Sequence, residues 1–379
     1  MARSGPIDPS RLVLGIDVGN SKTHVAVTDR AGRLVGSTEG PGLCGLPVDP
    51  ALQLEALLQL VDDAVGIRVD FAAAAFAMAG LDLPVEEERM SRLVREAGVS
   101  ERAVVLNDTF ALLRTGSPSG KGIAVVAGAG INCVAVDGDR SVRFHSMGRI
   151  SGDWGGGQDV GEEALAVACR AEDGRGPATL LSERVPRHFA FERPLQVAEA
   201  VQLQEMPRSK LVELAPVAFA AALDGDDAAI AIVHRLADEV AAFIETALRR
   251  LGSPPAEVPV LLGGGLLQSG NAILMHRILA TPALTGIAVS IAGAPPIVGS
   301  VLLAFDQLSE DPPDAHTVAE QWASRAVGCA ATPFHTIGLQ APAAVTIGPD
   351  PVEWTPHKRE CSLWQDHVGT SPLSTKTRL

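Results

Sequence analysis

The chain has 379 residues, of which 46% are hydrophobic and 20% are charged. This composition is too apolar for a chain that is disordered throughout, and the length is sufficient for two or more domains with substantial cores. The 31 Lys and Arg residues against 45 Asp and Glu residues give a formal net charge of −14. Because nucleic-acid-binding surfaces carry a basic stripe, this charge argues against nucleic acid as a partner. The 38 Gly residues and the absence of Tyr indicate a core of Ala, Val and Leu with many tight turns.

The sequence shows no segment that is typical of export or membrane insertion. The apolar stretch near the N-terminus is shorter than a signal-peptide core, and the Ala-rich segment 71–81 is too short to span a bilayer. We therefore expect a cytoplasmic protein without a membrane partner. Its cysteines are far apart and form no CxxC pair, which argues against a zinc site, a cluster site built from close pairs or a disulfide framework. These cysteines are Cys44, Cys133, Cys169, Cys329 and Cys361.

Apolar periodicity and Gly-rich turns predict short strands and helices in the first third of the chain. In chain order we expect a β-hairpin (11–30), a third strand (34–39), a helix (51–65), a buried strand (69–81), a charged helix ended by Gly98 (85–97), a strand (103–108) and a helix (109–116).

The same beginning then recurs, because residues 122–146 again read as strand, Gly-rich turn, strand, turn and strand. Long amphipathic helices are expected next, then a strand with a Gly-rich turn and a closing helix. Their ranges are 161–173 and 228–252 for the long helices, 258–279 for the strand, turn and following helix, and 295–308 for the closing helix. Residues 311–379 are rich in Pro, Thr and His without clean periodicity, so we expect a poorly structured tail there.

The first candidate site is the turn of the first hairpin, Asp17-Val18-Gly19-Asn20-Ser21-Lys22-Thr23. An acid at the end of a strand followed by Gly, Ser and Thr suits a metal–nucleotide site, because backbone N–H groups of such a turn can surround phosphate oxygens. Asp17 could hold Mg²⁺ through water, and Lys22 or Thr23 could contact phosphate directly. No helix follows, so the turn is neither a Walker loop nor a dinucleotide fingerprint. A polar hairpin turn also needs Gly and Asn for purely structural reasons.

Two further Gly-rich turns have the same character. Gly128-Ala129-Gly130-Ile131-Asn132 lies between two strands, where small residues permit close backbone approach to a phosphate. Two such hairpins, each opening a sheet, could together clamp a nucleoside triphosphate from both sides. Gly263-Gly264-Gly265 follows a strand and precedes a helix, so its bare backbone could support an adenine ring or could simply make a tight turn.

Two segments are candidates for the acceptor side of the site. Asn107 and Asp108 end a strand, and Asp108 could be a general base that accepts a proton from a substrate hydroxyl, or it could be the N-cap of the next helix. The loop 151–159 holds Trp154 among glycines, a setting that we do not expect for core filler. A flat aromatic face beside Asp153 and Asp159 suits a sugar, and the alternative is a flexible loop with Asp159 near a helix N-terminus.

These five segments, in this order, resemble the actin-like ATPase superfamily and, within it, the BadF/BadG/BcrA/BcrD-type ATPase family, which includes N-acetylglucosamine kinases. The resemblance covers residues 11–309. LGIDVGNSKT is similar to the first phosphate motif, VVAGAGINC to the second, LLGGGLL to the adenosine motif and APPIVGSVLLAF to the closing helix. It implies an α/β fold of two ribonuclease H-like domains with a nucleotide in the cleft between them.

The resemblance also implies roles for single residues. Asp17 matches the metal-side acid, Asp108 the catalytic base, and Trp154 the aromatic residue near the sugar. Two departures concern the sugar more than the nucleotide. GGGQDVGEE replaces the family's usual GWG and GDEGS pattern, and Leu43 stands where the amino-sugar kinases commonly carry Asn.

We therefore expect one actin-like ATPase domain over 10–116, a second over 117–310, and a tail over 311–379. The predicted function is ATP- and Mg²⁺-dependent phosphorylation of a hydroxyl of a sugar or amino sugar, above all N-acetylglucosamine or glucosamine. A homodimer is compatible with this interpretation. Two alternatives stay open: an ATPase that activates a redox enzyme, which the cysteine spacing disfavours, and a non-catalytic sugar or nucleotide sensor on the same fold.

Overall fold

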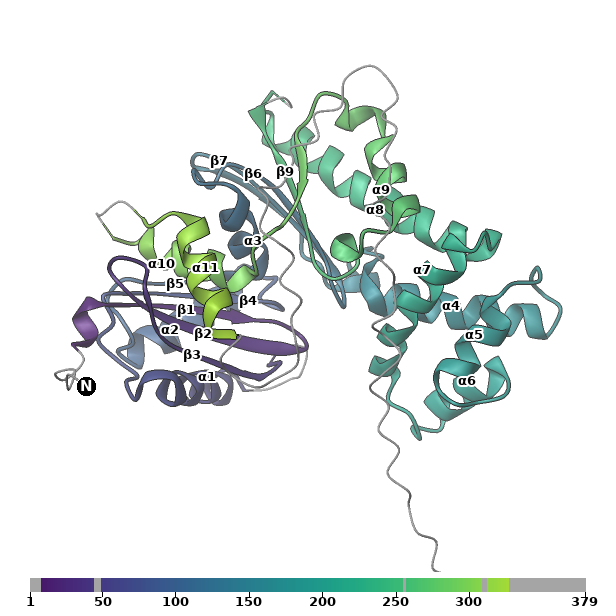
Figure 1. Ribbon diagram of the computed structural model, residues 1–379, viewed down its shortest axis with the longest axis horizontal. Coiled ribbons are helices and arrows are strands. Elements are labelled where there is room, and N and C mark those ends of the chain that lie inside the picture. The colour runs from purple at the N-terminus through teal and green to yellow at the C-terminus, as the bar shows by residue number, and fades with distance from the viewer. Residues whose placement is uncertain (1–7, 44–48, 255–256, 309–311, 327–379) are drawn as a thin grey trace, which may run out of the picture.

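The computed structural model describes residues 8–43, 49–254, 257–308 and 312–326. The chain forms two lobes, each built on a five-stranded sheet with helices packed against it (Figure 1). The α/β class and the two similar halves that the sequence predicts are confirmed by this architecture.

The first sheet combines an antiparallel meander with two parallel strands. Its strands are β1 (Leu12–Val18), β2 (Lys22–Asp29), β3 (Leu34–Pro41), β4 (Ala73–Met78) and β5 (Ala103–Asn107), in the order β3-β2-β1-β4-β5. β1 and β2 form the first predicted hairpin, and β1, β4 and β5 run parallel with Val18, Met78 and Asn107 level with one another. Because parallel strands end at the same edge of a sheet, the residues that follow them meet there.

Helices cover both faces of the first sheet. They are α1 (Pro50–Val65), α2 (Pro84–Glu96), α3 (Asp108–Gly116), α10 (Pro296–Phe305) and α11 (Ala315–Ala326). α1 and α2 pack on the face that carries Leu14 and Phe76, and α10 packs on the opposite face, which carries Val13. The contact with α10 is close: a Cβ on Gly15 would lie 2.7 Å from the backbone N of Val301. β1 therefore needs glycine at this crossing.

The second lobe repeats the hairpin beginning and then adds helices. Its strands are β6 (Gly122–Ala127), β7 (Ile131–Asp137), β8 (Arg140–Arg143), β9 (Val260–Gly263) and β10 (Val289–Ile291), in the order β10-β9-β6-β7-β8. β6 and β7 form the second predicted hairpin, and β9 lies parallel to β6. The helices of this lobe are α4 (Gly156–Glu172), α5 (Leu181–His188), α6 (Pro194–Gln202), α7 (Ala215–Leu223), α8 (Asp227–Leu251) and α9 (Ala272–Leu279).

Short 3₁₀ helices connect several of these elements. They are η1 (Pro9–Arg11), η2 (Gly148–Ile150), η3 (Arg208–Leu214), η5 (Leu267–Ser269) and η6 (Pro282–Leu284). No helix in the described part of the chain is both long enough and apolar enough to cross a membrane.

The C-terminal part differs from the sequence prediction. A boundary at 310 places α10 in the second lobe, but α10 packs against β1, β4 and α3 of the first. A tail from 311 is expected to lack structure, but α11 is a helix that buries Val318 and Ala319 against the first lobe (Figure 1). The sequence does not reveal it because a helix of three turns gains its stability from the surface on which it docks. Residues 327–379 lie outside the described residues.

Candidate active site

The carboxyl edge of the first sheet holds Asn107 and Asp108, and their roles differ. Asn107 is the N-cap of α3, since its Oδ1 accepts hydrogen bonds from the backbone N of Thr109 at 3.1 Å and from its Oγ1 at 2.6 Å. The cap reading that the sequence left open for Asp108 thus belongs to its neighbour. Asp108 is the first residue of α3 and is half-buried. The Asp108 carboxylate is therefore not the capping group of α3 and can interact with a substrate.

Two carboxyl groups at this edge have pKa values above the ordinary value of an aspartate. Burial, with the nearby charges of Asp17 and Asp82, raises the pKa of Asp108 to about 7. Burial, with the charges of Glu86 and Asp153, raises the pKa of Asp82 to about 6. A carboxyl group with a pKa near neutrality can accept and release a proton at physiological pH. The structure thus gives Asp108 the ionisation that a general base requires.

The raised pKa of Asp108 makes a prediction for stability. The folded chain binds this proton more tightly than the unfolded chain, where the pKa is 3.8, so the free energy of unfolding falls as pH rises from about 4 to about 7. Asp108→Asn removes this penalty. We expect its Tm to exceed that of the wild type by a few degrees at about pH 8 and by less at about pH 5. Thermal unfolding at the two pH values measures this, and an equal difference at both would contradict it.

Asp82 was not predicted, although it follows the end of β4 as Asp108 follows the end of β5. Its Oδ1 accepts hydrogen bonds from Nδ2 of Asn107 and from Nδ2 of Asn132, both at 3.1 Å. The Asn132 amide also reaches Oδ1 of Asn107 at 3.3 Å. The sequence assigned Asn132 to the nucleotide, whereas its side chain links the second hairpin to the acceptor edge of the first lobe. The available signal for Asp82 was an acid in the short turn after a buried strand, four residues beyond Met78 at the end of β4.

An ion pair also links the lobes beside these residues. The guanidinium of Arg143 in β8 donates to both carboxylate oxygens of Glu87 in α2, at 2.6 and 2.7 Å. Glu87 in turn accepts from the backbone N of Asn107 at 3.1 Å, and Arg143 lies over the ring of Phe110 at 5.4 Å. This pair therefore positions the start of α3 relative to the second sheet.

Breaking that link should destabilise the chain measurably. Arg143→Met leaves the Glu87 carboxylate without its partner, and we expect a loss of about 1–3 kcal/mol in the free energy of unfolding. The double variant R143M/E87Q should recover part of it. Urea unfolding measures both, with Arg277→Met as the control, because the exposed Arg277–Asp238 pair should contribute less than about 1 kcal/mol. Equal losses of unfolding free energy in R143M and R277M would show that the Arg143–Glu87 pair stabilises the fold no more than an exposed ion pair does.

Four of the residues predicted to contact the nucleotide in the first hairpin turn are at least partly exposed, and a fifth, Thr23, is buried. Asn20 and Ser21 are exposed, and Gly19 and Lys22 are half-buried, with Gly19 N donating to Lys22 O at 2.9 Å. Thr23 is fully buried, and its Oγ1 donates to Pro41 O of β3 at 2.9 Å. A direct contact of Thr23 with phosphate therefore does not fit the structure, because its hydroxyl already holds the meander together.

The second hairpin turn presents bare backbone. A Cβ added to Gly128 or Gly130 would meet no atom within 4 Å, so open space lies beside both. The N-terminus of α4 packs on the turn, since Gly157 N donates to Gly128 O at 2.7 Å and Gln158 N to Ala129 O at 3.0 Å. This is why α4 begins at Gly156, five residues earlier than the predicted start. Two backbone hydrogen bonds from α4 thus fix the turn, while the space beside Gly128 and Gly130 stays open.

The three glycines after β9 have different reasons to be glycine. Gly264 has φ +85° and lies so close to Ala127 that a Cβ would be 2.4 Å from its carbonyl O. A Cβ on Gly263 would collide with Leu112, whereas one on Gly265 would meet nothing within 4 Å. Gly263 is level with Val126 of β6, so this turn lies beside the second hairpin. Gly264 makes the tight turn and Gly263 allows the close approach of Leu112, while the space beside Gly265 is open; contact of this turn with an adenine ring stays a prediction.

The Trp154 loop differs most from its prediction. Trp154 is only 3% exposed and belongs to the core of the second lobe. The guanidinium of Arg235 in α8 lies over its ring at 4.0 Å, and the indole Nε1 is buried without a hydrogen-bond partner among the described residues. The expectation that this Trp is not core filler was wrong, and its ring offers no free face for a sugar. The glycines around it allow the chain to pass close to β7 rather than exposing the ring.

The carboxylates of the same loop remain near the site. Asp153 accepts a hydrogen bond from Ser151 Oγ, and its charge contributes to the raised pKa of Asp82. Asp159 pairs with Arg149 at 3.2 Å and accepts from Gly155 N at 3.1 Å, so it holds the loop to the first turn of α4. Asp153 is therefore the loop residue best placed for an acceptor, and Asp159 organises the loop.

The residues present fit a nucleotide with a magnesium ion. Open glycine faces at Gly128, Gly130 and Gly265 suit close contact of phosphate and adenine with backbone. Asp17 is 9% exposed, and its charge is among the causes that raise the pKa of Asp108, so the two carboxylates repel one another across the site. The described residues contain no group of three or more metal-ligating side chains. Mg²⁺ keeps its waters and uses one or two carboxylates together with substrate phosphate, and Asp17 is a carboxylate of this kind.

Comparison with known sequences decides the family. The sequence matches the BadF/BadG/BcrA/BcrD ATPase family over residues 14–304. The chain belongs to this family. The match spans both hairpins, Asp108, the Gly263–Gly265 turn and α10, and it ends before α11.

Two named kinases are similar to the chain at low identity. An N-acetylmuramic acid/N-acetylglucosamine kinase of Clostridium acetobutylicum is 24% identical over 69% of this chain and 87% of its own length. An N-acetyl-D-glucosamine kinase of Dictyostelium discoideum is 23% identical over 68% of this chain and 86% of its own length.

Solved structures show the same fold. A candidate N-acetylglucosamine kinase from Chromobacterium violaceum superposes with a TM-score of 0.60 at 23% identity and covers 78% of this chain and 100% of its own. A second, from Porphyromonas gingivalis, gives a TM-score of 0.59 at 20% identity, with 76% and 96% covered. These likenesses establish the actin-like two-lobed fold for this member of the family.

Proposed function

We propose that this family member transfers the γ-phosphoryl group of ATP to a hydroxyl of an amino sugar, with N-acetylglucosamine and glucosamine as the first candidates. The observation that carries the proposal is Asp108, a carboxyl group with a pKa of about 7 at the carboxyl edge of the first sheet, where Asn132 of the second hairpin donates hydrogen bonds to Asp82 and Asn107. A proton acceptor in this position is what a kinase needs for its acceptor and what a simple nucleotide switch does not need. The two similar kinases support the substrate class, because both are named as kinases of N-acetylated sugars.

Asp108 carries the chemical step in this proposal. Its carboxylate accepts the proton of the acceptor hydroxyl while that oxygen attacks the γ-phosphorus in line, and ADP leaves. The start of α3 is fixed by the Asn107 cap and by the bond from Asn107 N to Glu87, so the carboxylate has a defined position. Precise positioning of the reacting groups supplies much of the rate in phosphoryl transfer.

Residues of both lobes bind the nucleotide in this proposal. The phosphates lie between Gly19–Ser21 of the first turn and Gly128–Gly130 of the second, and the adenine lies against Gly265. Asp17 would hold Mg²⁺, and this ion would neutralise charge on the phosphates of the nucleotide. Asn132, Asp82 and Asn107 tie the lobes together next to the γ-phosphate.

The sugar is held by hydroxyl acceptors rather than by a stacked aromatic ring. Trp154 is excluded from stacking by its burial and by Arg235. Asp153 and Asp108 are the carboxylates that we assign to the acceptor hydroxyls, because Asp82 interacts with both: the charge of Asp153 raises the pKa of Asp82, and the charge of Asp82 raises the pKa of Asp108. We assign the acetyl group to the exposed apolar side chains of Met147, directly before η2, and Ile150, at the end of η2, because they precede Asp153 by a few residues.

A panel of sugars tests the proposal. ADP formation should depend on both Mg²⁺ and an amino sugar, and should be greatest for N-acetylglucosamine or glucosamine among hexoses, N-acetylhexosamines and N-acetylmuramic acid. Turnover that is the same with and without any sugar would contradict a kinase function. Sugar-induced thermal stabilisation without ADP formation would instead favour a sensor, and iron in anaerobically purified protein would favour a redox activator.

A further inference from the structure

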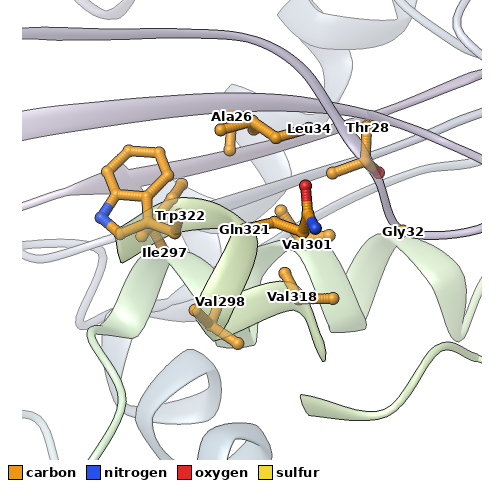
Figure 2. A pocket seen from close by; sticks show the side chains of 10 residues that line it. All are labelled: Ala26, Thr28, Gly32, Leu34, Ile297, Val298, Val301, Val318, Gln321 and Trp322. Atoms are coloured by element: carbon orange, nitrogen blue, oxygen red, sulfur yellow. The ribbon is translucent and has the colours of Figure 1, made fainter. Parts of the chain in front are cut away.

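Helix α11 lies beyond the segment that the family shares, yet it reaches the metal side of the candidate site. The family match ends at residue 304, and α11 spans Ala315–Ala326. It docks on β2, β3 and α10 through Val318, which is 4% exposed, and leaves a small apolar cavity beneath it that Ala26, Leu34 and Ile297 also line (Figure 2). The first lobe thus has a C-terminal helix bound across the back of its hairpin.

One side chain of this helix contacts a buried histidine. The ring of Trp322 meets the imidazole of His24 edge to face, with the ring centroids 5.4 Å apart and an interplanar angle of 78°. Figure 2 shows Trp322 at the end of the cavity beside β2. His24 is 7% exposed and lies directly opposite Asp17 in the β1–β2 pair. Trp322 therefore closes one side of the space in which the imidazole sits.

The imidazole lies between two carboxylates. Its Nε2 is 3.0 Å from Oε2 of Glu39 in β3, which fixes the plane of the ring. Its Nδ1 then faces Oδ2 of Asp17 at 3.7 Å and has no hydrogen-bond partner among the described residues. Contacts of this kind behind a metal-side carboxylate set the direction in which its oxygens point.

We propose that His24 positions Asp17 for the magnesium–nucleotide complex, and that Trp322 of α11 holds His24 in place. The inference rests on the proposed function, since it concerns the same nucleotide site. His24 and Trp322 act through Asp17 and touch neither nucleotide nor sugar. The consequence is that the nucleotide site of this chain depends on a helix outside the segment common to the family.

Binding of a non-hydrolysable ATP analogue tests this by calorimetry, with and without Mg²⁺. His24→Ala should keep the affinity for the analogue that is measured in EDTA. The factor by which Mg²⁺ increases this affinity should fall about tenfold in this variant. In Trp322→Ala the factor by which Mg²⁺ increases the affinity should fall about threefold. His24→Asn should recover part of it, because its amide nitrogen occupies nearly the position of Nδ1. A residue needed only for folding would lower stability without separating the two affinities.

The control variants isolate the ring contact from the docking of the helix. Trp322→Phe keeps an aromatic ring on His24, and Val318→Ala weakens the same helix one turn away without touching His24. Both should retain the Mg²⁺-dependent increment within about twofold. An unchanged increment in H24A, or an equal loss in V318A and W322A, would overturn the inference. Failure of the wild-type chain to bind the analogue at all would overturn the proposed function and this inference with it.

Discussion

Asp108→Asn should lower kcat by about a thousandfold, because general-base catalysis by a positioned side chain contributes about a hundredfold to ten-thousandfold. The amide has nearly the same shape but cannot accept the proton of the acceptor hydroxyl. The N-cap of α3 belongs to Asn107, so the helix should begin as before. The Kd for ATP should therefore change little while the chemical step is lost. Steady-state kinetics and calorimetry on the same preparation separate the two quantities.

A matched carboxylate provides the control for this variant. Asp139 lies exposed in the turn between β7 and β8, at the end of β7 away from Asn132, and Asp139→Asn should keep the wild-type kcat. A kcat for D108N close to that of D139N would remove Asp108 from the mechanism.

Asp17→Asn should have the second largest effect, through the magnesium–nucleotide complex. A metal ion contributes several kcal/mol of charge stabilisation in phosphoryl transfer, and a loss of about 3 kcal/mol corresponds to about a hundredfold in kcat/KM. The variant should also need more Mg²⁺ for half-maximal rate. Asp29→Asn is a suitable control, because Asp29 lies at the opposite end of the same hairpin and pairs with Arg33.

The same variant has a second signature in the pH dependence. The Asp17 charge helps to raise the pKa of Asp108, so its removal should lower that pKa. The rate of the wild-type chain should rise with pH through about 7 as Asp108 becomes ionised, and the midpoint of this rise should move to lower pH in D17N. A midpoint that stays unchanged would show that the two carboxylates do not interact across the site.

The hairpins and the strand ends were predictable because they depend on local signals. Alternating apolar residues around Gly19 and around Gly128 specify hairpins, and two similar beginnings predict two similar sheets. Asp108 was found because it directly follows a buried strand, and the family resemblance then assigned it the role of base rather than that of helix cap. Asp82 has a weaker form of this signal, because it lies four residues beyond the end of β4 rather than directly after the strand.

Other features depend on contacts between segments that are distant in the sequence. The burial of Trp154 depends on Arg235 and on the core of the second lobe, and the burial of Thr23 depends on Pro41. The docking of α11 requires the surface that β3 and α10 build together with Ala26 and Thr28 of β2. Local composition carries no information on such partners, which is why an isolated Trp among glycines was taken for a ligand contact.

Transfer of a labelled γ-phosphoryl group tests the central claim most directly. The measurement follows label from ATP into sugar phosphate and into inorganic phosphate in parallel, with Mg²⁺ and N-acetylglucosamine or glucosamine present. The account predicts that label enters the sugar, that wild-type transfer exceeds D108N transfer by about a thousandfold, and that little inorganic phosphate forms. Label released only as inorganic phosphate, at a rate that no sugar changes, would contradict it.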